Sequence, residues 1–259
     1  MTPLPPRAPA PASAARRLPA APAPAPASAP AFSLRAALPA LLLAVLALLP
    51  EAAAAPVAAA PVVGAPGAPD PIVFVHGWNT DGSTWNTMAD RFRADGWPAD
   101  RLDRWTYPSS QSNVTTATEL AQEIDRVLAA TGAAKVDLVT HSMGGLSSRH
   151  YLKNLGGTAK VDAWISLAGP NHGTTTARWC GGAACAEMRP GSAFLAALNT
   201  GDETPGDTRY ATWWSPCDSI IDPDDTVALT GAANTRTACL QHTAFPVDAG
   251  VYAQVKASL

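Results

Sequence analysis

A serine stands at a point of the chain where its hydroxyl could act as a nucleophile. Ser142 follows the apolar run Val136–Val139 and precedes Gly144 and Gly145. Where a strand turns sharply into a helix, the side chain at the turn is exposed at the carboxyl edge of the sheet, and the residues two before and two after it must be small. Gly144 meets that requirement, whereas Thr140 stands where glycine is usual. The alternative interpretation is an ordinary helix start capped by Ser142.

A nucleophilic serine needs a general base, and histidine is the usual one. In an open parallel sheet the acid and the base come from loops after other strands, in the chain order serine, acid, histidine. We predict His242 as the base because it is the only histidine in the last 80 residues and follows the last predicted strand. His172 comes before any plausible acid, and His150 falls on the helix after the serine. His141 directly precedes the serine and should point away from it.

The base needs an orienting carboxylate, and four aspartates compete for that role: Asp218, Asp222, Asp224 and Asp225. We favour Asp218 because it comes first after the predicted strand Tyr210–Trp214, where a short loop would hold it near the sheet edge. The other three surround a proline and are candidates for turn residues or for a Ca²⁺ site. Calcium takes about six to eight oxygen ligands, and the sequence does not show that enough oxygens converge here.

Acyl chemistry at a serine also needs hydrogen-bond donors for the developing oxyanion. In a strand–turn–helix of this kind, one donor is the backbone N–H after the nucleophile, and the other comes from the loop after the first strand. The first is that of Met143. His76 and Gly77 end the first apolar run, so the N–H of Trp78 is the candidate for the second.

These residues must be positioned by alternating strands and helices. Continuous apolar runs predict strands buried on both faces, and apolar residues at helical spacing predict the helices between them. The pattern predicts a compact α/β fold with a mostly parallel sheet and helices on both faces. The expected strands are 71–75, 104–107, 136–139, 161–167, 210–214 and 235–240. The expected helices start at Ser83, at Ser112 or Asn113, at Met143 and near Val247, and we expect Ser83 to cap the first of them. The first three helices are expected to end at Gly96, Gly132 and Gly156.

Composition limits what the chain can be. Of 259 residues, 47% are hydrophobic and 15% charged, with a net charge of −3. Without residues 1–70, 14 Lys and Arg remain against 19 Asp and Glu, and the absence of a basic stretch argues against a nucleic-acid partner. The sequence has no run of 18 apolar residues, which argues against a spanning helix.

The first part of the chain has a different composition. Sixteen of the 25 prolines lie in residues 1–70, and residues 1–35 carry four arginines and no acid. A basic start, the short apolar block 36–49 and small residues at 53–60 predict a secretory signal peptide over 1–60. The adjacent residues Arg16 and Arg17 are compatible with export by the twin-arginine route as an alternative. We expect residues 61–70 to be a flexible leader and 71–259 to be a single catalytic domain.

Several strings in the chain resemble the small secreted bacterial triacylglycerol lipases of the class 2 lipase family. They are Val75–Gly77, Val136–Gly145, Leu167–Thr174, Trp214–Asp218 and Leu240–His242, and the resemblance extends from about residue 71 to the C-terminus. It implies an α/β-hydrolase fold, a Ser142/Asp218/His242 triad, oxyanion donors at Trp78 and Met143, no cofactor, and fatty-acyl esters as substrates. The net charge and the lack of a His/Cys/carboxylate ligand set in the sequence predict catalysis without a metal. A partial flap over the site, formed by residues 174–209, is an alternative to an uncovered site. Contact with a lipid–water interface is also compatible with the resemblance.

Other activities fit the same residues. A triad does not specify the leaving group, so a polyester, a thioester, an amide or acyl transfer to another alcohol are alternatives. A secreted protein of this fold that only binds its ligand is the non-catalytic alternative. We expect a monomer.

The four cysteines lie between positions 180 and 239, and an even number in an exported chain favours disulfides over a metal site. If Asp218 and His242 meet, their loops must converge. Cys217 and Cys239 would then lie within bonding distance. We therefore predict the pairs Cys217–Cys239 and Cys180–Cys185.

Overall fold

The protein is described by a computed structural model that places residues 67–259. The predicted signal peptide, and the leader up to residue 66, lie outside the described residues, so the proposed boundaries at 60 and 70 remain predictions.

One six-stranded sheet forms the centre of the described region. Its order is β2-β1-β3-β4-β5-β6, and every neighbouring pair is parallel. The strands are β1 (Ile72–Val75), β2 (Leu102–Trp105), β3 (Val136–His141), β4 (Val161–Leu167), β5 (Arg209–Trp214) and β6 (Ala233–Arg236). The strand order reverses at β1, and ligands of open parallel sheets bind at the carboxyl ends of the strands beside such a point. The predicted α/β-hydrolase fold is confirmed.

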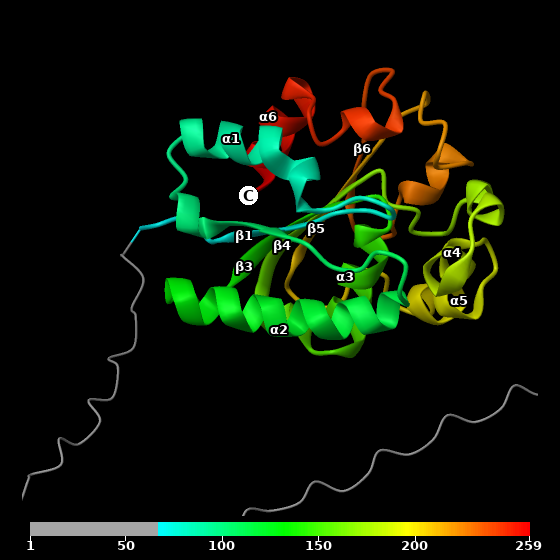
Figure 1. The fold of residues 1–259 in the computed structure, drawn as a ribbon, viewed down its shortest axis with the longest axis horizontal. Coiled ribbons are helices and arrows are strands. Elements are labelled where there is room, and N and C mark those ends of the chain that lie inside the picture. The colour runs from blue at the N-terminus through cyan, green and yellow to red at the C-terminus, as the bar shows by residue number, and fades with distance from the viewer. Residues whose placement is uncertain (1–66) are drawn as a thin grey trace, which may run out of the picture. The chain divides into compact units, whose positions relative to one another are not determined.

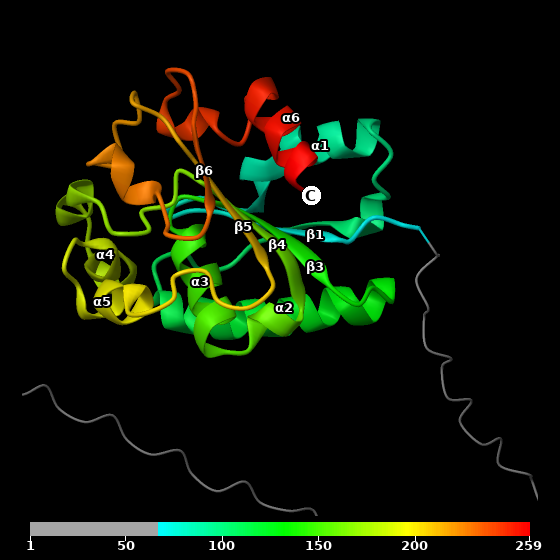
Figure 2. The same cartoon turned by 180° about the vertical axis from the view of Figure 1, so that it is seen from behind.

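Helices cover both faces of the sheet (Figure 1). On one face lie α1 (Asn86–Ala94) and α6 (Ala249–Ser258), and on the other lie α2 (Asn113–Thr131) and α3 (Gly144–Asn154). The short helices α4 (Gly182–Met188) and α5 (Ala193–Asn199) lie together beyond the carboxyl ends of the strands, as Figure 2 also shows from behind. Single 3₁₀ turns are η1 (Gly82–Trp85), η2 (Ala99–Arg101), η3 (Gly157–Ala159), η4 (Thr175–Trp179), η5 (Asp224–Val227) and η6 (His242–Ala244).

The side chains of β1 show how the sheet separates two cores. Ile72 and Phe74 belong to the apolar cluster shared with α1 and α6, whereas Val73 and Val75 belong to the cluster shared with α2 and α3. All four are fully buried. Successive residues of a strand point to opposite faces, so a continuous apolar run is what a strand covered on both sides requires. None of the helices within residues 67–259 is both long and apolar enough to cross a bilayer.

Polar caps determine where several helices begin. The Ser112 side chain accepts a hydrogen bond from the Val114 N–H, which makes Ser112 the N-cap of α2. Gly132 ends that helix at φ +63°, in the left-handed region that glycine adopts without strain. The expectation that Ser83 caps its helix is wrong, because Asp81 accepts from the Ser83 N–H and begins η1 instead. Asp248 caps α6, which begins at Ala249, close to the predicted start near residue 247.

The last strand differs most from its prediction. We expected a strand over residues 235–240, whereas β6 spans Ala233–Arg236. It is an edge strand that pairs with β5 alone, and most of its residues are exposed. An edge strand needs little apolar content, so its sequence carries no strong strand pattern. The apolar residue Leu240 lies in the following loop instead.

Candidate active site

Ser142 occupies a sharp turn between β3 and α3. Its φ is +54°, a conformation that residues other than glycine seldom adopt. Two backbone hydrogen bonds hold the turn: the Ser142 N–H donates to Leu167 O (2.9 Å), and the Gly145 N–H donates to Ser142 O (3.0 Å). A Cβ on Gly144 would lie 2.5 Å from the Val75 carbonyl oxygen. Glycine is therefore required there for the helix to approach the neighbouring strand, as the sequence pattern predicted.

Thr140 occupies the position where glycine is usual. Its hydroxyl donates to the Ile165 carbonyl oxygen on β4 at 2.9 Å, and the residue is fully buried. A Cβ on Gly145 would lie 3.6 Å from the Thr140 hydroxyl oxygen and 2.9 Å from that of Ser166. Thr140 is therefore accommodated by its hydrogen bond to β4, and a side chain at Gly145 would crowd Ser166 rather than Thr140.

His242 and Asp218 are in direct contact. The ring Nδ1 of His242 lies 2.8 Å from Asp218 Oδ2. The other carboxylate oxygen of Asp218 accepts from the backbone N–H groups of Ile220 (2.9 Å) and Ile221 (3.0 Å). Burial raises the pKa of Asp218, but the hydrogen bonds from His242 and from the two amides outweigh burial and leave that pKa below its ordinary value. The carboxylate is therefore ionised at neutral pH and accepts the His242 Nδ1–H.

The competing aspartates and histidines make other contacts. Among the four candidate acids, Asp218 is the one that contacts His242. Asp222 accepts a hydrogen bond from the Thr175 hydroxyl. The competing histidine, His172, lies beside Glu203, with 2.7 Å between its Nε2 and a carboxylate oxygen.

The ring of His141, which we expected to point away from Ser142, contacts the segment that carries His242. Its Nε2 lies 3.0 Å from the main-chain carbonyl oxygen of His242, and the two imidazole ring centroids are 4.6 Å apart. His141 lines the same cavity as Ser142 and His242. Burial lowers the pKa of His141 to about 3, so the ring is neutral at neutral pH. Because a carbonyl only accepts, Nε2 carries the proton.

The two predicted oxyanion donors belong to segments that meet at the serine, although Trp78 lies far from Ser142 in the sequence. Gly77 packs directly against Ser142, since a Cβ on Gly77 would lie 2.8 Å from the Ser142 Cβ. This contact brings the loop that carries Trp78 to the turn that carries Met143. Within residues 67–259, neither the Trp78 nor the Met143 backbone N–H has a hydrogen-bond acceptor. Both amides are thus unused by the fold. Ser142 and His242 are not hydrogen-bonded to each other in this structure.

Ser142 and His242 open into a mainly apolar cavity of about 570 Å³. Its apolar walls come from three loops at the carboxyl edge of the sheet. They are formed by Trp78, Ala177, Trp179, Met188, Ile220 and Ile221. No aspartate, glutamate, lysine or arginine lines the cavity. A space of this kind accommodates an uncharged, largely apolar ligand next to the serine.

The chain matches the family model described as lipase (class 2) over residues 69–243. This match extends over more than half of the sequence. The chain belongs to the class 2 lipase family. Membership places it among the lipase and esterase hydrolases.

Solved lipase structures share the fold of this class 2 lipase. The mature form of Bacillus licheniformis lipase BlEst2 superposes with a TM-score of 0.64 at 20% identity, over 75% of this chain and 94% of that one. Aspergillus fumigatus lipase B gives a TM-score of 0.58 at 15% identity, over 72% of this chain and 51% of that one. At these identities the likeness extends to the fold alone.

Two disulfide bonds flank the cavity of this family member. Cys217 is bonded to Cys239, with their Cα atoms 5.0 Å apart, and Cys180 is bonded to Cys185, with 5.8 Å between Cα atoms. The pairing is the one expected from the sequence. The first bond links the loop of Asp218 to the loop of His242, and the second closes a short loop at the cavity wall.

The sequence predicted a position at the rim of the cavity for Trp78 but not for the other exposed apolar residues there. Six large apolar side chains are substantially exposed in the described part of the chain, and three of them line this cavity. They are Trp78 (38% exposed), Trp179 (91%) and Ile220 (44%). The Arg189 guanidinium donates to the carbonyl oxygens of Ala177 and Cys180, both at 3.1 Å, and so braces the turn that presents Trp179. An isolated tryptophan in a polar loop gives no periodic signal that could have revealed this.

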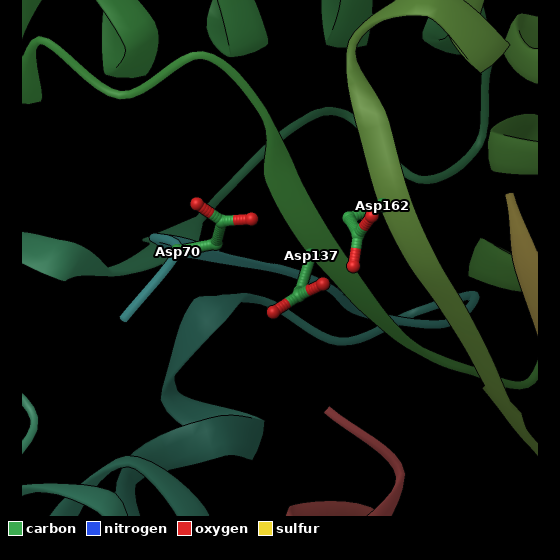
Figure 3. Close-up of side chains that lie close together, drawn as sticks. All are labelled: Asp70, Asp137 and Asp162. Atoms are coloured by element: carbon green, nitrogen blue, oxygen red, sulfur yellow. The ribbon is translucent and has the colours of Figure 1, made fainter. Parts of the chain in front are cut away.

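A group of three carboxylates lies at the opposite end of the strands from Ser142 (Figure 3). Carboxylate oxygens of Asp70, Asp137 and Asp162 lie within 4.8 Å of one another. Asp162 also lies 2.7 Å from an Arg209 guanidinium nitrogen and 3.7 Å from the Lys135 ammonium. The group takes no part in the candidate active site.

Proposed function

We propose that this protein is a serine hydrolase of carboxylic esters, with fatty-acyl esters such as triacylglycerols as its substrates. The observation that carries the proposal is the 2.8 Å contact between His242 Nδ1 and Asp218 Oδ2, in the same cavity as a serine held at positive φ. In this proposal Ser142 is the nucleophile, His242 the general base and Asp218 the residue that orients the base.

The proposed reaction is a two-step acyl transfer. His242 Nε2 takes the proton of the Ser142 hydroxyl as its oxygen attacks the ester carbonyl, and the amides of Met143 and Trp78 stabilise the oxyanion. His242 then protonates the leaving alcohol. Water, deprotonated by the same imidazole, releases the acyl group as the acid. General-base catalysis contributes about 10²–10⁴-fold and one oxyanion donor about 10²–10³-fold.

The cavity supports an acyl chain as the part of the substrate that binds beside Ser142. Its walls are mainly apolar and include no aspartate, glutamate, lysine or arginine, so burying a hydrocarbon chain there dehydrates none of these charged groups. An acyl group with a charged end has no Asp, Glu, Lys or Arg partner in this lining. These properties favour esters of fatty acids over esters of charged acids.

Labelling of Ser142 tests the proposed chemistry. The full chain is treated with a fluorophosphonate probe, and turnover is measured on p-nitrophenyl esters from acetyl to palmitoyl. We expect one labelled peptide, containing Ser142, and ester turnover that Ser142→Ala abolishes. A chain that binds esters without labelling or turnover would support the non-catalytic alternative. Faster turnover of an amide, a thioester or a polyester, or acyl transfer to an added alcohol in preference to water, would favour the other acyl reactions.

The exposed rim supports contact with a lipid–water interface. Tryptophan is favoured where one side of a side chain is apolar and the other is wet, and the main chain on either side of Trp179 is held by hydrogen bonds from Arg189 to Ala177 and Cys180. We expect Trp179→Ser to lower the rate on emulsified tributyrin several-fold, with little change on a water-soluble monomeric ester. Leu155→Ser is the matched control, since Leu155 is also exposed (42%) but lies outside the cavity lining. An equal loss on both substrates would contradict interface contact.

Secretion is part of the same proposal. The two disulfide bonds are typical of proteins that work in an oxidising compartment. Together with the basic and apolar pattern of residues 1–60, they support export. Mass spectrometry of the extracellular protein should find a chain that begins near residue 60, whereas an intact N-terminus in the cell would contradict it.

A further inference from the structure

The base of the proposed triad is held at two points. Its ring is held by Asp218, at 2.8 Å from Nδ1. Its main-chain carbonyl lies 3.0 Å from the Nε2 of His141, and His141 immediately precedes the nucleophile. The second contact spans 101 positions of sequence and joins the end of β3 directly to the loop that carries the base.

We propose that His141 is a positioning residue, whose Nε2–H donates to the His242 carbonyl and fixes the base relative to Ser142. The proposal rests on the proposed function, because it assigns His141 a role toward that nucleophile and that base. It adds a residue that the Ser-His-Asp chemistry does not itself require.

The surroundings of His141 favour this role over one in binding or proton transfer. The residue is 4% exposed, and its ring packs edge-on against Trp85 at 6.4 Å between centroids. Its Nδ1 has no hydrogen-bond partner among the described residues, so the carbonyl contact is the one polar interaction of the ring. The side chain is thus held rigidly by packing and makes a single directed hydrogen bond.

The contact affects catalysis because it ties the main chain at His242 directly to the residue before Ser142. The loop carrying His242 is joined to the loop carrying Asp218 by Cys217–Cys239, but that bond ties base to acid, not base to nucleophile. His141 supplies the missing connection between the base and the turn at Ser142. A displacement of about 1 Å between reacting groups can cost about 10²-fold in rate.

A pair of variants with side chains of similar size isolates the donor. In His141→Gln the amide nitrogen can replace Nε2, whereas in His141→Met no donor is present. We expect kcat of His141→Met on a soluble p-nitrophenyl ester to fall by about 10–100-fold, with KM changed less than about threefold, and His141→Gln to recover most of kcat. The rate of fluorophosphonate labelling should follow kcat, because it also depends on His242 as base.

Thr208→Val is the matched control. The Thr208 hydroxyl is also buried and donates to a main-chain carbonyl, that of Val161, at 2.9 Å, but it lies at the opposite end of the sheet. The control should lose stability comparable to His141→Met and keep its kcat. Equal kcat in His141→Met and the wild type, or an equal loss in His141→Gln and His141→Met, would overturn the proposal.

A spectroscopic measurement separates this proposal from the proposed function. The Nδ1 proton of His242, shared with Asp218, gives a downfield NMR signal that needs no substrate. We expect this signal to persist in His141→Gln and to broaden or shift in His141→Met. If the wild type neither hydrolyses esters nor is labelled, the proposed function fails, and the signal still tests the contact. An unchanged signal in a folded His141→Met protein would refute the proposed role of His141.

Discussion

At the scale of single residues, the conformation of Ser142 is the feature that sets this turn apart from an ordinary capped helix start. A non-glycine residue in the left-handed region costs about 1–3 kcal/mol and persists only where its surroundings enforce it. Here the bonds to Leu167 O and from the Gly145 N–H enforce it, and the close contact with Gly77 leaves no room to relax. Strain of this kind has a functional explanation when it presents a hydroxyl to a cavity.

The proposed roles predict a graded response to substitution. Ser142→Ala and His242→Ala should each lower kcat by about 10⁴-fold or more, because each removes a group that reacts. Asp218→Asn should cost about 10³–10⁴-fold, since the amide can no longer hold the required tautomer of the base. Steady-state rates on a soluble ester measure these effects, and circular dichroism checks the fold of each variant.

Two neighbours of Asp218 serve as controls for the acid. Asp222→Asn and Asp224→Asn remove the same charge as Asp218→Asn but remove no contact with His242, so the rates of these variants should stay within a few-fold of the wild type. A crippling effect at either one, together with a mild effect of Asp218→Asn, would transfer the role of acid to that position.

At the scale of elements, the site depends on two loops that come from the ends of β5 and β6. Ser215 joins them: its hydroxyl oxygen accepts from the N–H groups of Cys217 (3.1 Å) and Leu240 (2.8 Å). The Cys217–Cys239 bond adds a covalent link between the same two loops. Acid and base are therefore carried by one cross-linked unit rather than by two independent loops.

Removal of each disulfide bond should separate a catalytic effect from a purely structural one. The Cys217→Ala/Cys239→Ala variant should lose about 3 kcal/mol of unfolding free energy and the Cys180→Ala/Cys185→Ala variant about 2 kcal/mol, following the length of the closed loops. Activity at a temperature where both variants are folded should fall several-fold in the first only. Urea unfolding and ester turnover measure the two effects. An equal loss of activity in both variants would indicate that the acid and base loops keep their geometry without their bond.

At the scale of the whole molecule, the sequence predicted the features that depend on local pattern. The continuous apolar runs of β1, β3 and β4, and the small residue required at Gly144, could be read directly because buried parallel strands and sharp turns restrict residue type. The hydrogen bond from His141 to the His242 carbonyl could not be read, because it joins residues 101 positions apart. The edge strand β6 and the exposed Trp179 carry no periodic pattern, so the sequence placed the bounds of the strand too late and did not reveal the exposure of Trp179.

The end of the sheet opposite the site limits stability as the pH rises. Asp137 is 4% exposed, and its carboxylate accepts from the Ala163 N–H at 3.1 Å. Burial, with Asp70 and Asp162 nearby, raises its pKa to about 7 from an ordinary value of 3.8. The folded state therefore holds a proton that the unfolded state releases between about pH 4 and pH 7. Linkage then requires the stabilising contribution of this group to be complete below about pH 4 and lost as the pH rises to about 7.

Replacing this carboxyl by an amide should remove the pH-dependent loss. In Asp137→Asn the side-chain oxygen can still accept from the Ala163 N–H, and the amide nitrogen can donate to the neighbouring carboxylates of Asp70 and Asp162. We expect equal stability of variant and wild type near pH 4, and a variant more stable by about 1–3 kcal/mol at pH 8. Thermal melts of both proteins from pH 4 to pH 8 measure the difference, in which all other titrating groups cancel. A difference in Tm that is constant with pH, or a higher Tm of the wild type at pH 8, would contradict this prediction. Either result would mean that Asp137 is ionised in the folded protein without a cost in stability, because Arg209 and Lys135, which contact Asp162, stabilise its charge.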